Sequence, residues 1–547
     1  MTDVLIVGAG PVGLSLAIEL GQRGIHCIVV EKNDRVGKAP RAKTTNTRTR
    51  EHLRRWGIAE RLREVSPIPR DYPARALFVT SFTGHLLAIF ENALNCSPER
   101  NEWYSESSQW VPQYTLENVL LERVQALPNV SVRFNCRLET TEQSPSEVRS
   151  EVVDVVSGER ATIRSSYMVG ADGVHSRVRN LIGVKMEGKH DLARFVNLIF
   201  YAPDLAASHP FGKAIHYWFV NRDLPIIIGP MDDGVEGKWF LGVPIIPNGP
   251  DVEHMDASEI LRIAAGVEVA TEVLATDPWT SSSLIAGSYR DKRIFLAGDA
   301  CHTHPPFGGF GMNMGIGDAV DLGWKLAATL QGWGGAELLD AYESERRPVH
   351  LVVLNEAVAN QAILGNSLVR DEIDAEGPEG ERVRAEAGRA IVAAKRREFD
   401  TLGVVLGYHY DGSPLLVGDG TPAPAADYST YIPSARPGRV APHAWLADGS
   451  SLYDRFGLGF TLLVLSEADP EGVARFTAAA AARGVPFDVA APKEPRLAEL
   501  YQAGFALIRP DQHVAWRGDA IPENAREIFD RVCGDFSPAP PVAAASA

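Results

Sequence analysis

The sequence predicts a mixed α/β fold in which a Rossmann-like domain is interrupted by an antiparallel sheet and followed by a third α/β unit. Three observations predict this arrangement. A glycine-rich turn lies between two apolar strands in residues 3–31, and two more strand ends rich in glycine and aspartate occur in 167–179 and 293–328. Apolar and aromatic runs separated by Gly, Pro and Asp fill residues 186–284, which is typical of antiparallel strands.

Composition narrows the classes of function. The 547 residues carry a formal net charge of −16, so neither nucleic acid nor an anionic membrane surface is an expected partner. The five cysteines are scattered without a CxxC, which indicates a reducing compartment and no disulfide scaffold. No apolar run is long enough to span a membrane, and Asp3 stands where a signal peptide would be basic. We therefore expect a cytoplasmic protein.

The first element is a strand–turn–helix–strand unit. Residues 3–7 read as a buried strand, and Gly8, Gly10 and Gly13 follow in the spacing G-x-G-x-x-G. A helical repeat and a second strand ending in Glu31 complete the unit. The glycines allow a tight turn and close approach of a pyrophosphate, while the acid can accept hydrogen bonds from a ribose. The unit predicts a dinucleotide site but does not separate FAD from NAD.

Two later segments favour FAD. A strand in 167–179 runs into a turn that contains Asp172, and a strand in 293–328 ends at Asp299. Asp299 can bind ribityl hydroxyls, and the small residues Gly309 and Gly311 let the backbone pass close to a flat ring. The helix that begins there directs its positive end toward the ring, where a reduced flavin carries negative charge.

Together, G-A-G-P-V-G, G-A-D-G-V-H-S-R-V-R and G-D-A-C-H-T-H-P-P-F-G-G-F-G-M-N resemble the single-component FAD-dependent aromatic hydroxylases, which include para-hydroxybenzoate hydroxylase and phenol hydroxylase. Residues 40–58 and 111–124 look most like the chlorophenol and hydroxyphenylpropionate hydroxylases. The resemblance implies that NADPH or NADH reduces FAD, that O2 adds at flavin C4a, and that the hydroperoxide hydroxylates a phenolic ring, usually ortho to a hydroxyl. The substrate is expected to be a small phenolic or polyketide-type aromatic.

Two other functions stay open at this point. A flavin dehydrogenase or reductase on the same scaffold would pass electrons without inserting oxygen. A flavin-fold module that only carries a partner protein would not need the complete motif at 298–313.

The resemblance also implies roles for individual residues. Arg41 should lie beside the flavin or its pyrophosphate, Gln113 near the ribityl or phosphate region, and Asp172 and Arg179 should serve both FAD and the nicotinamide donor. The expected cofactor-binding residues are Gly8, Gly10, Pro11, Val12, Gly13, Glu31, Lys32, Arg41, Gln113, Asp172, Arg179, Asp299, Pro306, Gly309, Gly311, Met312 and Asn313.

Four residues are candidates for contact with the substrate: Lys43, His216, Tyr217 and His304. Lys43 stands where phenol hydroxylase carries an acid, so it could stabilise a phenolate or simply face a phosphate. His216 and Tyr217 are neighbours on one predicted strand and therefore point to opposite faces, so only one of them should reach the substrate. His304 is near Cys301 and His302, but no further metal-type ligands accompany them, and we expect no metal.

The predicted domains are discontinuous. We assign 1–72, 105–185 and 285–365 to the FAD-binding domain, 73–104 and 186–284 to the substrate-binding sheet domain, 366–439 to a solvated helical connection and linker, 440–536 to a thioredoxin-like domain, and 537–547 to a disordered tail. Cys533 is the only cysteine of the thioredoxin-like domain, which excludes dithiol chemistry within it. In relatives this domain is associated with subunit contact, so we expect a homodimer.

Overall fold

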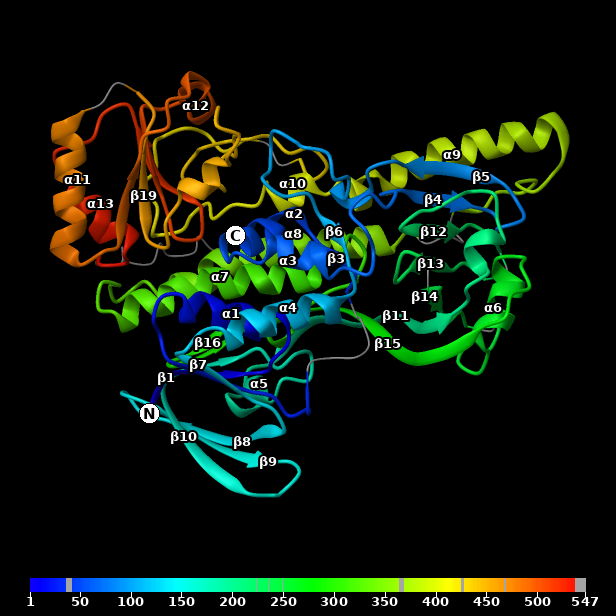
Figure 1. The fold of residues 1–547 in the computed structure, drawn as a ribbon, viewed down its shortest axis with the longest axis horizontal. Helices are drawn as coiled ribbons and strands as arrows, with labels where there is room; N and C mark the ends of the chain where they lie inside the picture. Colours follow the sequence, from blue (N-terminus) through cyan, green and yellow to red (C-terminus); the bar gives the residue numbers. More distant parts are fainter. Residues whose placement is uncertain are drawn as a thin grey trace, which may run out of the picture.

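The computed structural model describes residues 1–35, 42–222, 224–234, 236–247, 249–363, 368–424, 427–466 and 469–536. Arg41 and the predicted tail at 537–547 lie outside them. Two large sheets and a smaller C-terminal sheet surround a layer of long helices (Figure 1). The predicted fold class is confirmed. Within the described residues, no helix combines the length and the apolar character needed to cross a membrane.

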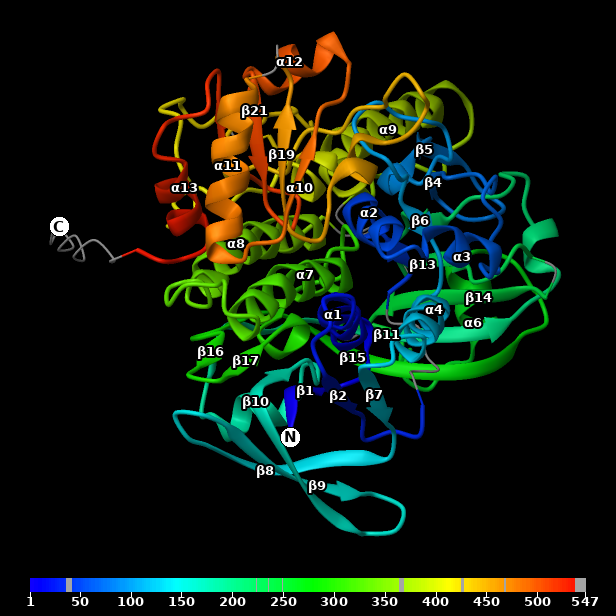
Figure 2. The same cartoon turned by 60° about the vertical axis from the view of Figure 1, so that its left-hand side comes forward.

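The first sheet has the strand order β16-β17-β10-β1-β2-β7. Its strands are β1 (Thr2–Val7), β2 (Cys27–Val30), β7 (Val130–Arg133), β10 (Arg160–Gly170), β16 (Arg290–Asp291) and β17 (Ile294–Leu296). β17, β10, β1, β2 and β7 are mutually parallel, as a Rossmann-like sheet requires. The strands β8 (Cys136–Gln143) and β9 (Val148–Asp154) extend β10 as an antiparallel flap (Figure 2).

Helices cover this sheet where its strands are apolar throughout. α1 (Pro11–Gly21) packs against α4 (Gln113–Gln125) and α7 (Gly311–Leu330), and α7 packs against α8 (Ala341–Gln361). The core strands are apolar on both faces; Leu5 and Ile6, for example, point to opposite faces and are fully buried. The segment between β2 and α4 adds β3 (Thr44–Thr45), α2 (Thr47–Arg55), α3 (Ala59–Glu64) and β6 (Gln109–Trp110). β3 and β6 form a two-stranded ladder that pairs Thr44 with Trp110.

The second sheet has the order β18-β15-β11-β14-β13-β12-β4-β5. Its strands are β4 (Ala76–Val79), β5 (Leu86–Phe90), β11 (Met186–Tyr201), β12 (His216–Phe219), β13 (Ile227–Pro230), β14 (Lys238–Pro244), β15 (Glu272–Ala286) and β18 (His302–Thr303). All its pairs are antiparallel except β12 with β4. One face packs against α6 (Ala257–Ala264) in an apolar cluster, and the other carries aromatic rings that meet the loop around Phe307.

The predicted solvated helical connection is only partly right. A helix, α9 (Gly377–Phe399), does form, but it packs along β5 and buries one stripe of its surface. Val383, Ile391 and Phe399 belong to the aromatic cluster of the second sheet. The charge density of the segment concealed this stripe, because the apolar residues recur only at helical spacing among many arginines and glutamates.

The C-terminal unit forms a four-stranded sheet in the order β20-β19-β21-β22. Its elements are β19 (Phe460–Val464), α11 (Pro470–Arg483), β20 (Phe487–Ala490), α12 (Pro495–Tyr501), β21 (Phe505–Ile508), β22 (Val514–Gly518) and α13 (Ala525–Val532). A parallel pair joined by a helix is followed by an antiparallel hairpin and a final helix, which is the predicted thioredoxin-like order. α12 was not predicted. This unit and the second sheet lie at opposite ends of α7 and α8 (Figure 1).

Candidate functional site

The three glycine-rich segments lie side by side at one edge of the first sheet. Gly8 follows β1, Glu31 follows β2, Asp172 follows β10 and Asp299 follows β17. These four strands are neighbours and run parallel, so their carboxyl ends lie side by side. This edge is where open α/β sheets bind nucleotides.

The turn after β1 has the shape of a phosphate cradle. Gly8 has φ +108°, and a Cβ added there would lie 2.4 Å from the carbonyl oxygen of Ala171; one added at Gly13 would lie 2.0 Å from the carbonyl oxygen of Gly8. A Cβ at Gly10, in contrast, would meet no atom within 4 Å. α1 begins at Pro11 without a side-chain cap, so its first N–H groups are available to an anion. The open space beside Gly10 therefore fits a pyrophosphate.

Glu31 is held at the mouth of this turn. Its Oε2 accepts a hydrogen bond from the N–H of Ala9 at 3.0 Å, and its Oε1 accepts two from Asn33. The carboxylate is partly buried and stays beside the turn, where the ribose of a bound dinucleotide would be expected. The neighbouring Lys32 is exposed.

Asp172 and Arg179 order the second loop. The carboxylate of Asp172 accepts hydrogen bonds from the hydroxyl of Ser176 and the N–H groups of Arg177 and Val178, so it caps α5 (Arg177–Leu181). Arg179 donates to the carbonyl oxygens of Val174 and Ala300, at 2.8 and 3.0 Å, and so ties this loop to the one after β17.

The third loop passes close to the segment around Thr44. Gly309 has φ +67°, and a Cβ there would lie 3.1 Å from the Cβ of Thr44. Asn313 is buried, donates to the carbonyl oxygens of Thr44 and Gly309, and accepts from the N–H of Asn46. Its side chain therefore clamps the loop to the backbone and has no donor left for a ligand. α7 begins at Gly311 without a side-chain cap, and its free N–H groups are the ones that remain for a flavin.

The remaining expected cofactor residues surround this loop. Val12 fills the space that a Cβ at Gly298 or at Gly315 would take, so it holds α1 against the start of α7. Asp299 and Pro306 are exposed, and Met312 is partly buried. Gln113 accepts from the N–H of Ala42 at 3.0 Å and donates to Glu117, which places it at the start of α4.

Behind the loop, Asp318 of α7 joins four groups. Its Oδ2 accepts from the N–H of Gly298 and from His302, and its Oδ1 accepts from Arg346 and lies 2.9 Å from His350 Nε2. Cys301 is also close enough to form a metal-ligating group with His302 and Asp318.

Protein groups already occupy the carboxylate of Asp318, the acidic member of this possible metal-ligating set. Burial alone would raise the pKa of Asp318, but His350 and Arg346 outweigh it and hold that pKa well below its usual range. Burial raises the pKa of the Cys301 thiol well above its ordinary value, which opposes metal binding. These contacts anchor the loop after β17 to α7. The expectation that no metal binds here stays a prediction.

The two candidate residues of β12, Tyr217 and His216, lie on opposite faces of the second sheet. Tyr217 points toward α6, is buried in the apolar cluster there, and donates to the carbonyl oxygen of Gly212 at 2.5 Å. His216 points the other way, and its ring centroid lies 4.6 Å from that of Trp110 and 5.9 Å from that of Phe240. Tyr217 is therefore not among the residues that face the flavin loop.

Lys43 and His216 lie at the face of the second sheet that carries Trp218 and Phe240 and contacts Trp110 and Phe307, a group of rings that we call the aromatic space. The Nζ of Lys43 lies 4.1 Å from the centroid of Phe240, and no ion pair is formed by Lys43 among the described residues. The ring nitrogens His216 Nδ1, Trp218 Nε1, Trp279 Nε1 and His304 Nε2 are buried without a hydrogen-bond partner in the described part of the chain. Buried polar atoms without partners are rare, and several around one space indicate a ligand site.

Burial sets the charge states in this space. It lowers the pKa of Lys43 to about 8, with a smaller opposing effect from Asp277. It lowers the pKa of His216 to about 3, reinforced by Lys43, and that of His304 to about 4, reinforced by His302. At neutral pH Lys43 therefore keeps its charge, while the imidazoles of His216 and His304 are neutral. The His304 ring lies next to Gly311, at the start of α7.

Comparison with known proteins decides the family. Residues 1–357 match the family described as FAD binding domain, and residues 434–535 match the family described as aromatic-ring hydroxylase, C-terminal. The chain belongs to the FAD-dependent aromatic-ring hydroxylases.

Relatives of this hydroxylase match it along nearly its whole length. Tetracenomycin B2 monooxygenase-dioxygenase of Streptomyces olivaceus is 32% identical and covers 97% of each chain, and 2,4-dichlorophenol 6-monooxygenase of Delftia acidovorans is 30% identical and covers 94% of each. The solved structure of RebC with bound 7-carboxy-K252c has a TM-score of 0.90, with 36% identity over 98% of this chain and 99% of RebC.

The predicted family, cofactor and reaction type are confirmed. The hydroxylase is an FAD-dependent aromatic monooxygenase that uses NAD(P)H and O2, and oxygen insertion is favoured over the dehydrogenase alternative.

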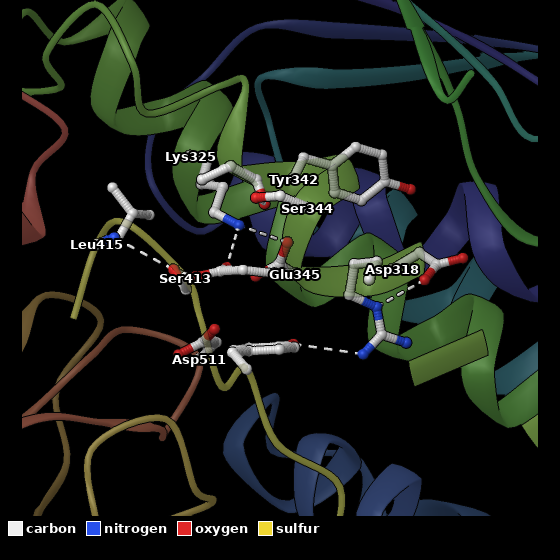
Figure 3. A network of polar contacts seen from close by, with 12 residues as sticks. Asp318, Lys325, Tyr342, Ser344, Glu345, Ser413, Leu415 and Asp511 are labelled. Carbon is white, nitrogen blue, oxygen red and sulfur yellow. Dashed lines mark hydrogen bonds and ion pairs between the residues drawn. The ribbon is translucent and has the colours of Figure 1, made fainter. Parts of the chain in front are cut away.

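A second buried network joins this hydroxylase's flavin helix to its C-terminal unit. Lys325 of α7 donates to Asp321 and to Glu345 of α8, at 2.6 and 2.5 Å (Figure 3). Ser413 donates to Glu345 from the linker, and Arg509 reaches the same carboxylate from the turn after β21. The ends of α7 and α8 are thus fixed by groups that lie far away along the chain.

Sequence reasoning missed these charged residues. Asp318, Asp321 and Lys325 recur at spacings of three and four along an otherwise apolar helix, which places them on one buried face. That spacing was the available signal. Their partners Arg346 and Arg509 carry no local signal, because the contacts depend on how α8 and the C-terminal unit pack.

Proposed function

We propose that this hydroxylase inserts one oxygen atom of O2 into a phenolic ring, ortho to an existing hydroxyl, with NADPH or NADH as the electron donor. The observation that carries the proposal is Lys43, which forms no ion pair among the described residues and lies over Phe240, in the aromatic cluster that also contains Phe307 of the flavin loop. Bound FAD supplies the oxygen-activating chemistry. The side chains of the protein bind the ring, orient it and keep water away from it.

The cofactor would be held by the edge of the first sheet. In this proposal the turn at Gly8, Gly10, Pro11, Val12 and Gly13 receives the pyrophosphate, and Glu31 and Lys32 stand beside the adenosine ribose. Gln113, Asp172, Arg179 and Asp299 shape the ribityl region, while Pro306, Gly309, Gly311, Met312 and Asn313 form the bed of the flavin ring. The open space at Gly10 and the uncapped starts of α1 and α7 support this assignment.

Lys43 would act on the ring oxygen of the substrate. A positive charge next to a phenol favours the phenolate, which makes the neighbouring ring carbon more electron-rich. The desolvation that lowers the pKa of Lys43 also strengthens its attraction for an anion, since little water screens the pair.

His216 and His304 would position the ring without carrying charge. Their lowered pKa values keep both imidazoles neutral. The Nδ1 of His304 donates to the carbonyl oxygen of Pro305, so its Nε2 is left as an acceptor, whereas His216 can present a donor or an acceptor. Trp218, Phe240 and Phe307 would form the apolar walls that exclude water. We do not assign Tyr217 to the site, because its hydroxyl is buried on the far face of the sheet.

The test is product analysis under labelled oxygen. Purified holoenzyme is incubated with NADPH or NADH, ¹⁸O2 and a panel of mono- and polycyclic phenols, and products are identified by mass. We expect a substrate to accelerate donor oxidation and to gain one ¹⁸O atom beside an existing hydroxyl. Donor oxidation that leaves every phenol unchanged would refute the phenol proposal while leaving the family assignment intact. The same assay, run with each donor, determines the preference between NADPH and NADH.

The proposal extends to the oligomeric state and the cellular compartment of the protein. We propose a cytoplasmic homodimer, supported by the absence of a disulfide framework among the described cysteines and by the thioredoxin-like unit. Light scattering coupled to size-exclusion chromatography would give about twice the 59.4 kDa chain mass for a dimer; a monomer mass would contradict this part.

A further inference from the structure

A separate cavity lies on the outer side of Trp110. It has a volume of about 40 Å³ and is lined by residues of α2, of α3 and of the segments that lead into β4 and β6. Trp110 forms one wall, and the same indole contacts His216 in the aromatic space. The indole N–H is not free to reach a ligand, since it donates to the carbonyl oxygen of Pro230 at 3.2 Å. Trp110 therefore borders both the cavity and the candidate substrate site.

The lining of this cavity is strongly cationic. Arg50, Arg63 and Arg70 contribute to it together with Ser108 and Gln109, and no aspartate or glutamate is among the described residues that line it. Such a lining is unusual in a chain whose net charge is −16. The sign of the charge points to an anionic ligand.

The arginines beside the cavity pair with carboxylates that are not among its lining residues. Glu106 lies behind the cavity wall and is shared by Arg50, Arg54 and Arg63, with Arg50 at 3.0 Å and Arg54 at 3.1 Å. Arg50 is fully buried, and burial together with the charge of Arg63 lowers its pKa to about 10. Arg63 also pairs with Glu60 and Arg54 with Asp454, so carboxylates outside the lining offset the charge of these three arginines. The Nε of the buried Arg50 has no hydrogen-bond partner among the described residues and remains for a ligand.

Arg70 supplies the positive charge that these carboxylates do not offset. It is exposed at the mouth of the cavity, where it donates to the carbonyl oxygen of Pro98 at 3.2 Å. A carbonyl carries no net charge, so the charge of Arg70 remains available to a ligand.

We propose that this cavity binds a small oxyanion, namely inorganic phosphate or the carboxylate of a small organic acid. Guanidinium groups pair with carboxylate and phosphate oxygens in bidentate geometry, and Ser108 and Gln109 add neutral hydrogen-bonding groups. A volume of about 40 Å³ holds a few water molecules, since a single water needs about 10–15 Å³. It therefore suits a compact anion and leaves no room for an aromatic ring or a nucleotide.

The test is calorimetric titration of the holoenzyme with sodium phosphate and, separately, sodium acetate, without phenol or nicotinamide and at constant ionic strength. We expect saturable binding of at least one of the two anions at one site per chain. Arg63→Gln and Arg70→Gln should each weaken it at least tenfold. The matched control is Arg61→Gln, because Arg61 lies on the same helix, α3, but pairs with Glu122 on the surface and does not line the cavity.

Several results would overturn the proposal. One is no saturable binding of either anion, which would leave the cavity to water. Another is unchanged affinity in Arg70→Gln, a variant expected to fold normally because its side chain is exposed. Titration with benzoate separates the two sites: binding of benzoate without phosphate or acetate would assign the anion to the aromatic space and also refute the cavity.

Discussion

Arg509 donates to both carboxylate oxygens of Glu345, at 2.6 and 2.8 Å, and so joins the C-terminal unit to α8. Both side chains are fully buried. Burial alone would raise the pKa of Glu345, but the charges of Arg509 and Lys325 outweigh it and lower that pKa to about 2. The pair keeps its charges because each member has further partners; Arg509 also binds Asp511 at 2.7 Å.

Breaking this pair should destabilise the whole chain. Arg509→Met leaves Glu345 and Asp511 buried with less compensation, which should lower the free energy of unfolding by about 3–5 kcal/mol. Urea denaturation followed by circular dichroism measures it. Arg382→Met is the control, because Arg382 forms exposed pairs with Glu379 and Glu386 on α9 and its loss should change the free energy of unfolding far less. Equal losses in the two variants would show that the buried pair has no special role.

Two glycines of the first turn should respond differently to substitution. Gly10→Val places its Cβ in open space at φ −77°, so the fold should persist while the space expected to receive the pyrophosphate is filled. Gly8→Val forces a clash with the carbonyl of Ala171 and should destabilise the protein itself. FAD content after purification and the thermal midpoint separate the two effects. Retention of a full complement of FAD by Gly10→Val would count against the cradle.

The charge of Lys43 should give ligand binding a pH dependence. The pKa of Lys43 is lowered to about 8, so the side chain is protonated below that pH and loses its charge above it. The affinity for a phenolate that is ionised throughout, such as dinitrophenolate, should therefore fall above pH 8 by up to about tenfold per pH unit. Lys43→Met should bind weakly and show no such decrease. A decrease of equal size in both proteins would assign the titration to another group.

Substitutions of Tyr217 and His216, neighbours on β12, should have different effects: one on stability and the other on substrate binding. Tyr217→Phe removes one buried hydrogen bond to Gly212 and should cost about 0.5–1.5 kcal/mol of stability without changing KM for the phenol. His216→Phe should leave stability similar and raise KM, because it changes the face that carries Lys43 and Trp110. Steady-state kinetics and thermal melts of both variants check this. The reverse assignment of effects would mean that the opposite face of the sheet binds the substrate.

The sequence was sufficient to predict the elements that rely on local pattern. The turn could be predicted because only glycine permits the close packing at Gly8 and Gly13 and leaves the space beside Gly10 open. The inward face of β12 could not, since Tyr217 and His216 sit in equally apolar surroundings along the chain and packing of α6 decides between them. The pair Arg509–Glu345 was also beyond prediction, because 164 residues separate its members.

The short ladder between β3 and β6 has a consequence for how substrate preference can change. It pairs Thr44 with Trp110 and so fixes where Lys43, the residue just before β3, emerges. Successive residues of an extended chain point to opposite sides. Inserting or deleting a single residue just before Thr44 would therefore turn the ammonium group away from the aromatic space without altering any of the residues that line it. The length of this connection, as much as its composition, would then be a means by which related enzymes gain or lose a preference for acidic aromatic compounds.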